Sequence, residues 1–317
     1  MVGPATLQIA LSEVANMPTR TSTKAVDAGA IRRSRAFPAM SPATAAVWLV
    51  TALGFLLLFW DPIRTLLRDW WSDPEAGHGL LLGPLAIALA YRKGIVEELK
   101  PQVALGVALL LAAVALRYVS GLAAELFTMR MSMLMALTGL IVYAAGMRQI
   151  LSWWLPLTLL VLSVPLPSVV LSSLALPLQL EASQLGAALL EARHVPVQLS
   201  GNVIHLPGRS LFVTEACSGL RSLTALIALG VLIGGLWLKS PILRVVLLAI
   251  TIPVAMMLNG LRIFLTGFLV YFVDPALGEG FMHYTEGWVI FGAAFLFLGA
   301  SAWMLAQAET LWRRRGA

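Results

Sequence analysis

The sequence contains a series of long apolar segments, and these constrain its fold more than any other feature. They lie at residues 43–60, 79–91, 103–120, 129–146, 150–166, 219–238, 245–271 and 287–306. Most contain about 18–25 residues, the length of helix that crosses a hydrocarbon core roughly 30 Å thick, and the second is shorter. Since lipid cannot satisfy free backbone groups, such segments are expected to be helical. The sequence therefore predicts an all-α polytopic membrane protein with about eight transmembrane helices.

Composition supports this assignment and narrows the partners. Hydrophobic residues make up 59% of the 317 residues and charged residues only 12%, whereas about a quarter of a soluble domain is charged. The net charge is +6 and the pI about 9.9, but the basic residues stand at the ends of apolar segments rather than in one patch. We therefore expect membrane lipids, and no nucleic acid, as partners.

Cysteine and histidine are too few and too scattered to predict a metal centre or another cofactor. Cys217 is the only cysteine, which excludes an intrachain disulfide, an iron–sulfur cluster and a cysteine-rich zinc site. The four histidines, His78, His194, His205 and His283, show no ligand spacing such as His-x-x-x-His. We expect no cofactor and no bound metal.

Lysine and arginine predict the orientation of the helices. With the N-terminus inside, the cytoplasmic segments hold Arg20, Lys24, Arg32, Arg33, Arg35, Arg92, Lys93, Lys100, Arg148, Lys239, Arg244, Arg313, Arg314 and Arg315. The outer segments hold only Arg64, Arg68, Arg193 and Arg209. Because cytoplasmic loops carry the excess of basic residues, both termini are expected in the cytoplasm.

The chain is expected to contain one membrane domain between two tails. Residues 1–40 are polar, basic and without apolar periodicity, and predict a disordered cytoplasmic tail. No apolar segment near the start indicates a cleaved signal peptide. The transmembrane domain is expected at residues 41–306, and a basic cytoplasmic tail at residues 307–317.

Two predicted outer segments are longer than simple connections. The first, residues 61–79, contains Trp70 and Trp71, which we expect to anchor the chain at the interface. The second, residues 167–216, begins with a leucine-rich stretch at 168–191 that predicts an interfacial amphipathic helix. Its remainder alternates around a Gly-Asn turn and predicts a small β-hairpin or three short strands. This extracytoplasmic element would lead into Cys217 as a lid or cradle.

Cys217 stands at the start of a predicted membrane helix, in Thr-Glu-Ala-Cys217-Ser-Gly-Leu-Arg221. A thiol at a helix N-terminus, one turn from a cation, is either an accident of composition or a nucleophile. Both a helix N-terminus and a nearby cation favour the thiolate, which is the reactive form.

Four arginines fall in or at apolar segments: Arg117, Arg130, Arg221 and Arg262. Arg117 and Arg130 stand near the outer ends of their helices, where we expect their side chains to snorkel to the interface. Arg262 lies deeper, about 14 Å from the outer end of its helix at 1.5 Å per residue. Asn259 is on the same face of that helix. This polar face indicates a structural cation or, as we favour, an active-site cation.

His283 stands in the predicted outer loop before the last helix. It is either an exposed loop histidine or a member of a site with Cys217 and Arg262, since all three belong to different helices and lie toward the outer side. In such a site histidine would take the thiol proton, and arginine would stabilise the oxyanion of a tetrahedral intermediate. This set of groups is suited to acyl transfer through a thioester.

At these residues the sequence resembles the exosortases, multipass membrane cysteine enzymes of the exosortase/archaeosortase family. The family's Cys-Ser-Gly motif with a following arginine matches Cys217 to Arg221, its Asn-x-x-Arg motif matches Asn259 to Arg262, and its later histidine matches His283. Gly77-His78-Gly79 looks like the family's early His-Gly element, although the two residues before His78 depart from the family's pattern. The resemblance covers about residues 45–306.

The resemblance implies a function that the spacing alone does not. Exosortases are thought to recognise exported proteins by a C-terminal sorting signal made of a Pro-Glu-Pro (PEP-CTERM) motif, a transmembrane helix and a basic cluster. They cleave this signal and transfer the new C-terminus to an acceptor, in bacteria that make extracellular polysaccharide. The chain would then be a thiol protease or transpeptidase of the inner (cytoplasmic) membrane, with its active site facing the periplasm.

The catalytic residues implied by the resemblance are Cys217, Arg262 and His283. Arg221, Asn259 and His78 are expected to bind substrate, with Arg221 pairing with the glutamate of the motif. The acceptor nucleophile stays open.

Two alternatives remain. A polytopic transporter or an exopolysaccharide polymerase would also contain functional arginines within the membrane. It would be expected to show inverted repeats and broken helices near the midplane, and the sequence shows no clear internal repeat. A catalytically inactive scaffold with the same fold is the second alternative.

Overall fold

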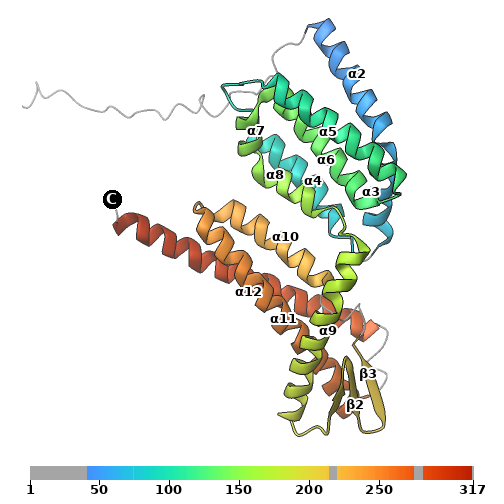
Figure 1. The fold of residues 1–317 in the computed structure, drawn as a ribbon. Coiled ribbons are helices and arrows are strands. Elements are labelled where there is room, and N and C mark those ends of the chain that lie inside the picture. The colour runs from blue at the N-terminus through green and yellow to red at the C-terminus, as the bar shows by residue number, and fades with distance from the viewer. Residues whose placement is uncertain (1–40, 74, 214–219, 275–280, 316–317) are drawn as a thin grey trace, which may run out of the picture. The chain divides into compact units, whose positions relative to one another are not determined.

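The computed structural model describes residues 41–73, 75–213, 220–274 and 281–315 of the chain (Figure 1). It divides into two compact units, residues 1–57 and 58–317. The tail at residues 1–40 and Cys217 lie outside the described residues.

The described residues are mainly helical. The helices are α2 (Pro42–Leu58), α3 (Trp60–Ser72), α4 (Gly79–Lys93), α5 (Val103–Leu122), α6 (Leu126–Ala145), α7 (Met147–Ser152), α8 (Trp154–Leu162), α9 (Ser168–Glu191), α10 (Leu220–Trp237), α11 (Pro241–Phe272) and α12 (Phe281–Arg315). Each predicted apolar segment contains a helix, but the segment at 150–166 is split between α7 and α8. The last helix continues to Arg315, into the segment expected to be a tail.

Four helices among the described residues are long and apolar enough to cross a membrane: Val103–Leu122, Leu126–Ala145, Pro241–Phe272 and Val289–Arg314. The number rises to five if α2 and α3 form one span. The prediction of an all-α polytopic membrane protein is therefore confirmed, whereas the number of eight spans is not reached. Helices α4 and α8 and the described apolar part of α10 are too short to satisfy the same length criterion.

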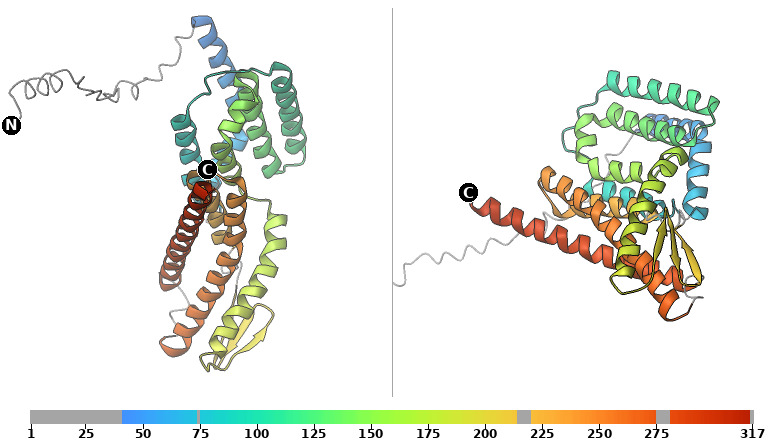
Figure 2. Two further views of the ribbon diagram at one scale, coloured as in Figure 1. Left: turned by 90° about the vertical axis from the view of Figure 1, so that its left-hand side faces the viewer. Right: turned by 60° about the horizontal axis from the view of Figure 1, so that its bottom comes forward.

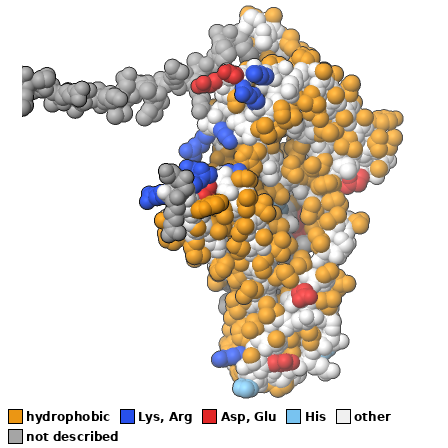
Figure 3. Space-filling model, turned by 60° about the vertical axis from the view of Figure 1, so that its left-hand side comes forward, with side chains coloured by type: hydrophobic (Ala, Val, Ile, Leu, Met, Phe, Trp, Pro, Cys, Tyr) orange, Lys and Arg blue, Asp and Glu red, His pale blue; other side chains and the backbone are white. Residues whose placement is uncertain are grey.

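Hydrophobic side chains cover much of the face shown in Figure 3. Large apolar residues that project outward include Leu81, Leu122, Ile242 and Trp312. Lysine, arginine, aspartate and glutamate are confined to small separate groups on the face shown. Such a surface is suited to contact with lipid, because a water-facing surface rarely exposes large contiguous apolar patches.

Residues 198–212 form a three-stranded antiparallel sheet in the order β1 (Gln198–Ser200), β2 (Val203–Leu206) and β3 (Arg209–Phe212). Ile204 of β2 pairs with Leu199 of β1 and with Leu211 of β3. Ile204 and Leu206 are buried in one cluster with Leu190 of α9 and Ile263 of α11. The sheet therefore packs on α9 and α11, and β3 ends five residues before Cys217 (Figure 2).

Helix α10, which follows the Cys217 motif, is held on two sides. Leu226 of α10 is buried in a cluster with Leu247 of α11 and Leu298 of α12. Ala228 of α10 belongs to another cluster with Leu82 of α4 and Leu159 of α8. Helix α10 thus packs against both the early helices and the late ones.

Candidate active site

Asn259 and Arg262 lie one turn apart on α11, as the sequence predicts. Asn259 is buried, with 5% of its surface exposed, and Arg262 is half-buried. Each of them interacts with a neighbouring group in the chain. A buried amide next to a half-buried guanidinium is costly unless both are satisfied, so this face of α11 is built around polar contacts.

The glycine within the Asn-x-x-Arg motif brings α11 close to α9. A Cβ atom at Gly260 would lie 2.6 Å from Cγ of Leu185, and a Cβ at Gly186 would lie 2.5 Å from Cγ2 of Ile263. Neither position has room for a larger side chain, since real Cβ contacts are not closer than 3.0 Å. Close packing of small residues thus fixes the height and rotation of Asn259 and Arg262 against α9.

The other residues of the predicted site are placed only in part. Cys217 lies outside the described residues, three positions before α10 begins at Leu220. Arg221 is the second residue of α10, and its side chain lies outside the described residues. His283 was expected in a loop, but its backbone belongs to the first turn of α12; its side chain is also outside the described residues.

A cavity of about 590 Å³ opens where α10 begins. Its polar lining comes from the end of α3, the loop before α4 and the start of α6, and its apolar lining from the connection between α8 and α9. Helix α10 contributes Thr224 and Ile227. The described lining residues are Asp69, Asp73, Glu75, His78, Ala124, Glu125, Leu126, Phe127, Arg130, Val161, Leu162, Val164, Pro165, Leu166, Pro167, Leu171, Thr224 and Ile227.

The distribution of basic residues predicts that these segments lie on one side of the membrane, the outer one. The structure therefore brings together loops that are far apart in sequence but predicted to share the outer side. Asn259 and Arg262 are not among the described lining residues. His78 and the start of α10 share this cavity, whereas Arg262 lies on a separate polar face.

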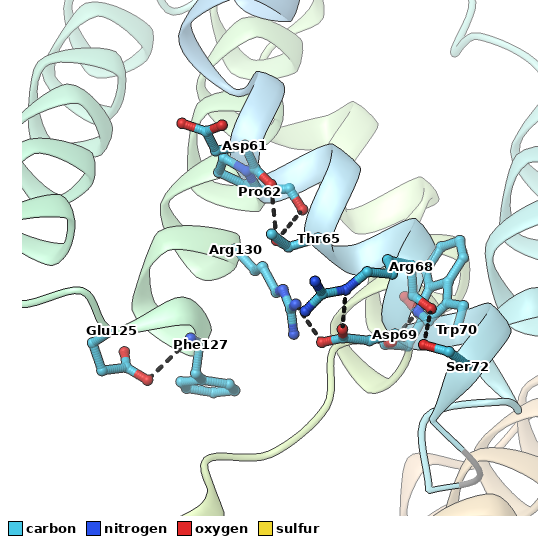
Figure 4. A network of polar contacts seen from close by, with 11 residues as sticks. Asp61, Pro62, Thr65, Arg68, Asp69, Trp70, Ser72, Glu125, Phe127 and Arg130 are labelled. Carbon is cyan, nitrogen blue, oxygen red and sulfur yellow. Dashed lines mark hydrogen bonds and ion pairs between the residues drawn. The ribbon is translucent and has the colours of Figure 1, made fainter.

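Arg130 of α6 is paired with Asp69 of α3 in the wall of the cavity (Figure 4). Nη2 of Arg130 donates to Oδ2 of Asp69 at 2.5 Å, and only 3% of the arginine side chain is exposed. The expectation that Arg130 snorkels to the interface is therefore wrong, because a carboxylate from α3 neutralises it inside the protein.

Arg117 of α5 has a partner on α3 as well. Its Nη2 lies 3.5 Å from Oδ2 of Asp61, and its side chain is 16% exposed. Its Nε also donates to the carbonyl oxygen of Leu58 at 3.4 Å. Since the side chain of Asp61 is 66% exposed, this pair is compatible with a position of Arg117 at the interface.

Glu125 caps the N-terminus of α6 at the edge of the same cavity. Its carboxylate accepts hydrogen bonds from the backbone N–H of Phe127 at 3.0 Å and of Thr128 at 2.6 Å, and from the Thr128 hydroxyl at 2.5 Å. Burial acts to raise the pKa of Glu125, but these hydrogen bonds and the positive charge of Arg130 together lower it. Glu125 is therefore held as an anion.

His78 and Trp70 fasten the end of α8 to the first helices. A ring nitrogen of His78, Nε2, lies 3.2 Å from the carbonyl oxygen of Leu162, and Nε1 of Trp70 donates to the carbonyl oxygen of Ser163 at 2.7 Å. A Cβ atom at Gly79 would overlap the indole nitrogen of Trp70. The expectation of Trp70 as an interfacial anchor is therefore wrong, because its ring packs inside against Gly79. Trp71, in contrast, is 83% exposed.

The carboxylates of the cavity were missed by the sequence analysis. Asp69, Asp73, Glu75 and Glu125 follow no motif, and their meeting depends on how α3 folds back toward α6. The available signal was the pair of buried-helix arginines, which need negative partners. The candidate partners in the sequence were the acids between residues 61 and 75, together with Glu125.

The chain was compared with protein families, curated proteins and solved structures, and the family comparison gave a match. No curated protein and no solved structure is detectably similar to it. The family model described as "Transmembrane exosortase" matches residues 70–300. This match covers more than half of the 317 residues and includes Cys217, Arg262 and His283. The chain is therefore a member of the transmembrane exosortase family.

Proposed function

We propose that the chain is a membrane-embedded cysteine transpeptidase that cleaves C-terminal sorting signals of the PEP-CTERM type through a thioester on Cys217. The observation that carries this proposal is the family match across residues 70–300, which includes all three residues with suitable chemistry. Family membership indicates a membrane transpeptidase. The sorting signal, the thioester and the residues that form it are the proposed part.

The position of the helices supports Cys217 as the nucleophile. Helix α10 begins at Leu220, directly after the cysteine motif, and the N-terminus of a helix favours a thiolate. His283 is in the first turn of α12, and α12 packs against α10 and α11. Arg262 is on α11, which packs against both helices.

The proposed reaction uses one base and one cation. His283 takes the thiol proton, and the sulfur attacks the carbonyl carbon of the scissile peptide. Arg262 stabilises the negative oxygen of the tetrahedral intermediate, where one such donor typically contributes about 10²–10³ in rate. The C–N bond then breaks, the leaving amine takes the proton from His283, and the acyl group remains on Cys217 as a thioester. Arg221 pairs with the glutamate of the motif, and Asn259 contacts the substrate beside Arg262.

The test coexpresses a tagged Pro-Glu-Pro substrate with the wild-type chain and with Cys217→Ala. Cleavage by the wild type and none by Cys217→Ala is expected, together with a thioester adduct on Cys217 that hydroxylamine releases. Cleavage that survives in Cys217→Ala would overturn the proposal. Arg262→Lys and His283→Ala test the two remaining roles separately. Arg221→Ala with unchanged processing would remove only the contact with the motif glutamate.

The proposed site faces the periplasm from the inner membrane. The basic residues support this orientation, since most of them fall on the side opposite to the cavity loops. A transporter or polymerase finds no separate support in the described residues, because none of their contacts indicates an ion or sugar pathway.

A further inference from the structure

The cavity at the start of α10 is lined by acidic residues that have no role in the proposed cleavage reaction. Among the described residues, four carboxylates line it, from Asp69, Asp73, Glu75 and Glu125, and the one guanidinium in that lining is that of Arg130. A ligand with a carboxylate would be repelled by this lining, whereas an ammonium group would be attracted. The negative charge of the lining therefore favours a cationic ligand and disfavours the glutamate of the Pro-Glu-Pro sorting signal.

Two of the four carboxylates are already satisfied within the protein. Asp69 is paired with Arg130, and Glu125 caps α6. Asp73 and Glu75 are half-buried, and the contact between them is a hydrogen bond from the backbone N–H of Glu75 to Oδ1 of Asp73 at 2.8 Å. Within the part of the chain that the structure describes, neither carboxylate forms an ion pair, so these two charges are the ones that a ligand would neutralise.

Arg130 supplies a second, independent indication of a ligand. Its side chain is buried in the cavity wall, with 3% exposed, yet its Nε has no hydrogen-bond partner among the described residues. A buried donor without an acceptor is costly. A ligand that carries a carbonyl oxygen beside its ammonium group would satisfy both this N–H and the free carboxylates.

His78 lines the same cavity with a defined tautomer. The carbonyl oxygen of Leu162 can only accept, so the contact at 3.2 Å requires the proton on Nε2 of His78. In the neutral ring Nδ1 is then the nitrogen with a lone pair. This is the nitrogen that can take a proton from a ligand in the cavity.

We propose that this cavity is the acceptor site of the transpeptidase and that it binds a primary amine with an adjacent carbonyl group. Asp73 and Glu75 bind the ammonium form, Arg130 donates to the carbonyl oxygen, and Nδ1 of His78 removes one proton. The resulting amine attacks the carbonyl carbon of the thioester on Cys217. A C–N bond forms and the C–S bond breaks with its electron pair on sulfur. The second proton of the amine returns to the sulfur, and His78 releases its proton to water.

This inference rests on the proposed function for its chemical step, but amine binding can be measured without it. The binding test uses the full-length Cys217→Ala chain in detergent, with glycinamide as the probe. Glycolamide is the matched control, because it replaces the ammonium with an uncharged hydroxyl. Glycinamide is expected to raise the unfolding temperature saturably, as any ligand of the native state does, and glycolamide is not.

In the Cys217→Ala chain, the added substitution Glu75→Gln is expected to abolish this shift in unfolding temperature. The control is Glu181→Gln, which changes an exposed acid of α9 outside the cavity and is expected to retain the shift. If glycinamide raises the unfolding temperature equally in the chains with and without Glu75→Gln, the amine site is overturned, independently of the result of the cleavage assay. A shift that depends on Glu75 in a chain that cleaves no sorting signal would support the amine site and overturn the proposed function.

The chemical test measures the ratio of glycinamide adduct to hydrolysed product at the new C-terminus by mass spectrometry. Glu75→Gln and Asp73→Asn are each expected to lower this ratio about tenfold by weakening attraction for the ammonium, and Glu181→Gln is expected to leave it unchanged. His78→Gln keeps a donor for the Leu162 carbonyl but has no base. It is expected to lower the adduct ratio even at saturating glycinamide, and an unchanged ratio would overturn the role of His78.

Discussion

Oδ2 of Asp69 accepts a hydrogen bond from Nη2 of Arg130 at 2.5 Å, although the two residues are 61 positions apart in the sequence. The pair joins the end of α3 to the start of α6 and forms part of the cavity wall (Figure 4). Because Arg130 is almost fully buried, its charge depends chiefly on Asp69 for compensation, the carboxylate that hydrogen-bonds to it, while Glu125 interacts with it at longer range.

Removal of the Asp69 carboxylate should destabilise the protein strongly. Asp69→Asn leaves Arg130 buried without the counter-charge that hydrogen-bonds to it, and loss of one partner of a buried pair typically costs about 3–5 kcal/mol. The matched control is Glu98→Gln, which breaks the Arg148–Glu98 pair, whose side chains are 56% and 76% exposed. Exposed pairs contribute about 0–1 kcal/mol. Thermal unfolding in detergent compares the two variants, and equal losses would show that the Asp69–Arg130 pair is not the dominant contact.

The contact between Gly79 and Trp70 predicts a steric effect at the His-Gly element. Gly79→Ala places a methyl group against the indole nitrogen, which must then move away from the Ser163 carbonyl. Overpacking of this kind costs about 1–3 kcal/mol. Gly299→Ala in α12 is the control, because a Cβ there meets nothing within 4 Å. Tryptophan fluorescence and unfolding temperature should change for Gly79→Ala alone; unchanged values would mean that α3 and α4 separate freely.

The close approach of α9 and α11 can be tested by compensation. Gly260→Ala would force Leu185 away and shift Asn259 and Arg262, with an expected loss of about 1–3 kcal/mol in stability and a fall in activity. The second substitution Leu185→Ala opens the space that the new methyl group needs. The double variant should recover stability and activity relative to Gly260→Ala. Additive losses in the double-mutant cycle would contradict the packing explanation.

The positions of the helices could be predicted from the apolar segments, because the length of a run of apolar residues is read directly from the local sequence. Helix α9 has the bounds that its leucine-rich stretch indicated, and the strands β1 to β3 follow the turn signals around Gly201 and Gly208. The family was also predicted, since the Cys-Ser-Gly and Asn-x-x-Arg motifs are short and local. The number of eight spans stays a prediction, because apolar composition does not distinguish a full crossing from a short apolar helix such as α8, and four or five spans satisfy the length expected among the described residues.

Long-range charge compensation could not be predicted in the same way. Asp69 partners Arg130 because α3 packs against α6, and Asp61 at the start of α3 lies near Arg117 of α5. Neither pairing has a signature in the order of residues. For the same reason the role of Glu309, which lies in a segment expected to be a tail, could not be predicted. Its carboxylate accepts from the backbone N–H groups of Lys239 and Ser240, at the turn that starts α11.

Glu125 predicts a dependence of stability on pH. Its pKa is lowered in the folded protein, so the folded state binds its proton less tightly than the unfolded state does. Glu125 therefore stabilises the protein above the ordinary glutamate pKa, and this contribution is lost as the pH falls through the lower folded value. Glu125→Gln should lose about 1 kcal/mol at pH 7, the usual contribution of a helix cap. Its stability should also change less than that of the wild type as the pH falls below about 4.5. Parallel curves for the two proteins would contradict this role.

The single cysteine allows the orientation of the proposed site to be measured directly. A membrane-impermeant maleimide, added to cells with a permeable outer membrane, has only Cys217 to react with in this chain. If the start of α10 faces the periplasm, Cys217 is labelled in intact cells. A permeant thiol reagent confirms that the cysteine is reactive in either orientation. The control chain combines Cys217→Ala with Arg148→Cys, which places the thiol in a segment predicted to be cytoplasmic, and it should be labelled only after lysis. Labelling of Arg148→Cys but not of Cys217 in intact cells would invert the orientation and place the proposed site in the cytoplasm.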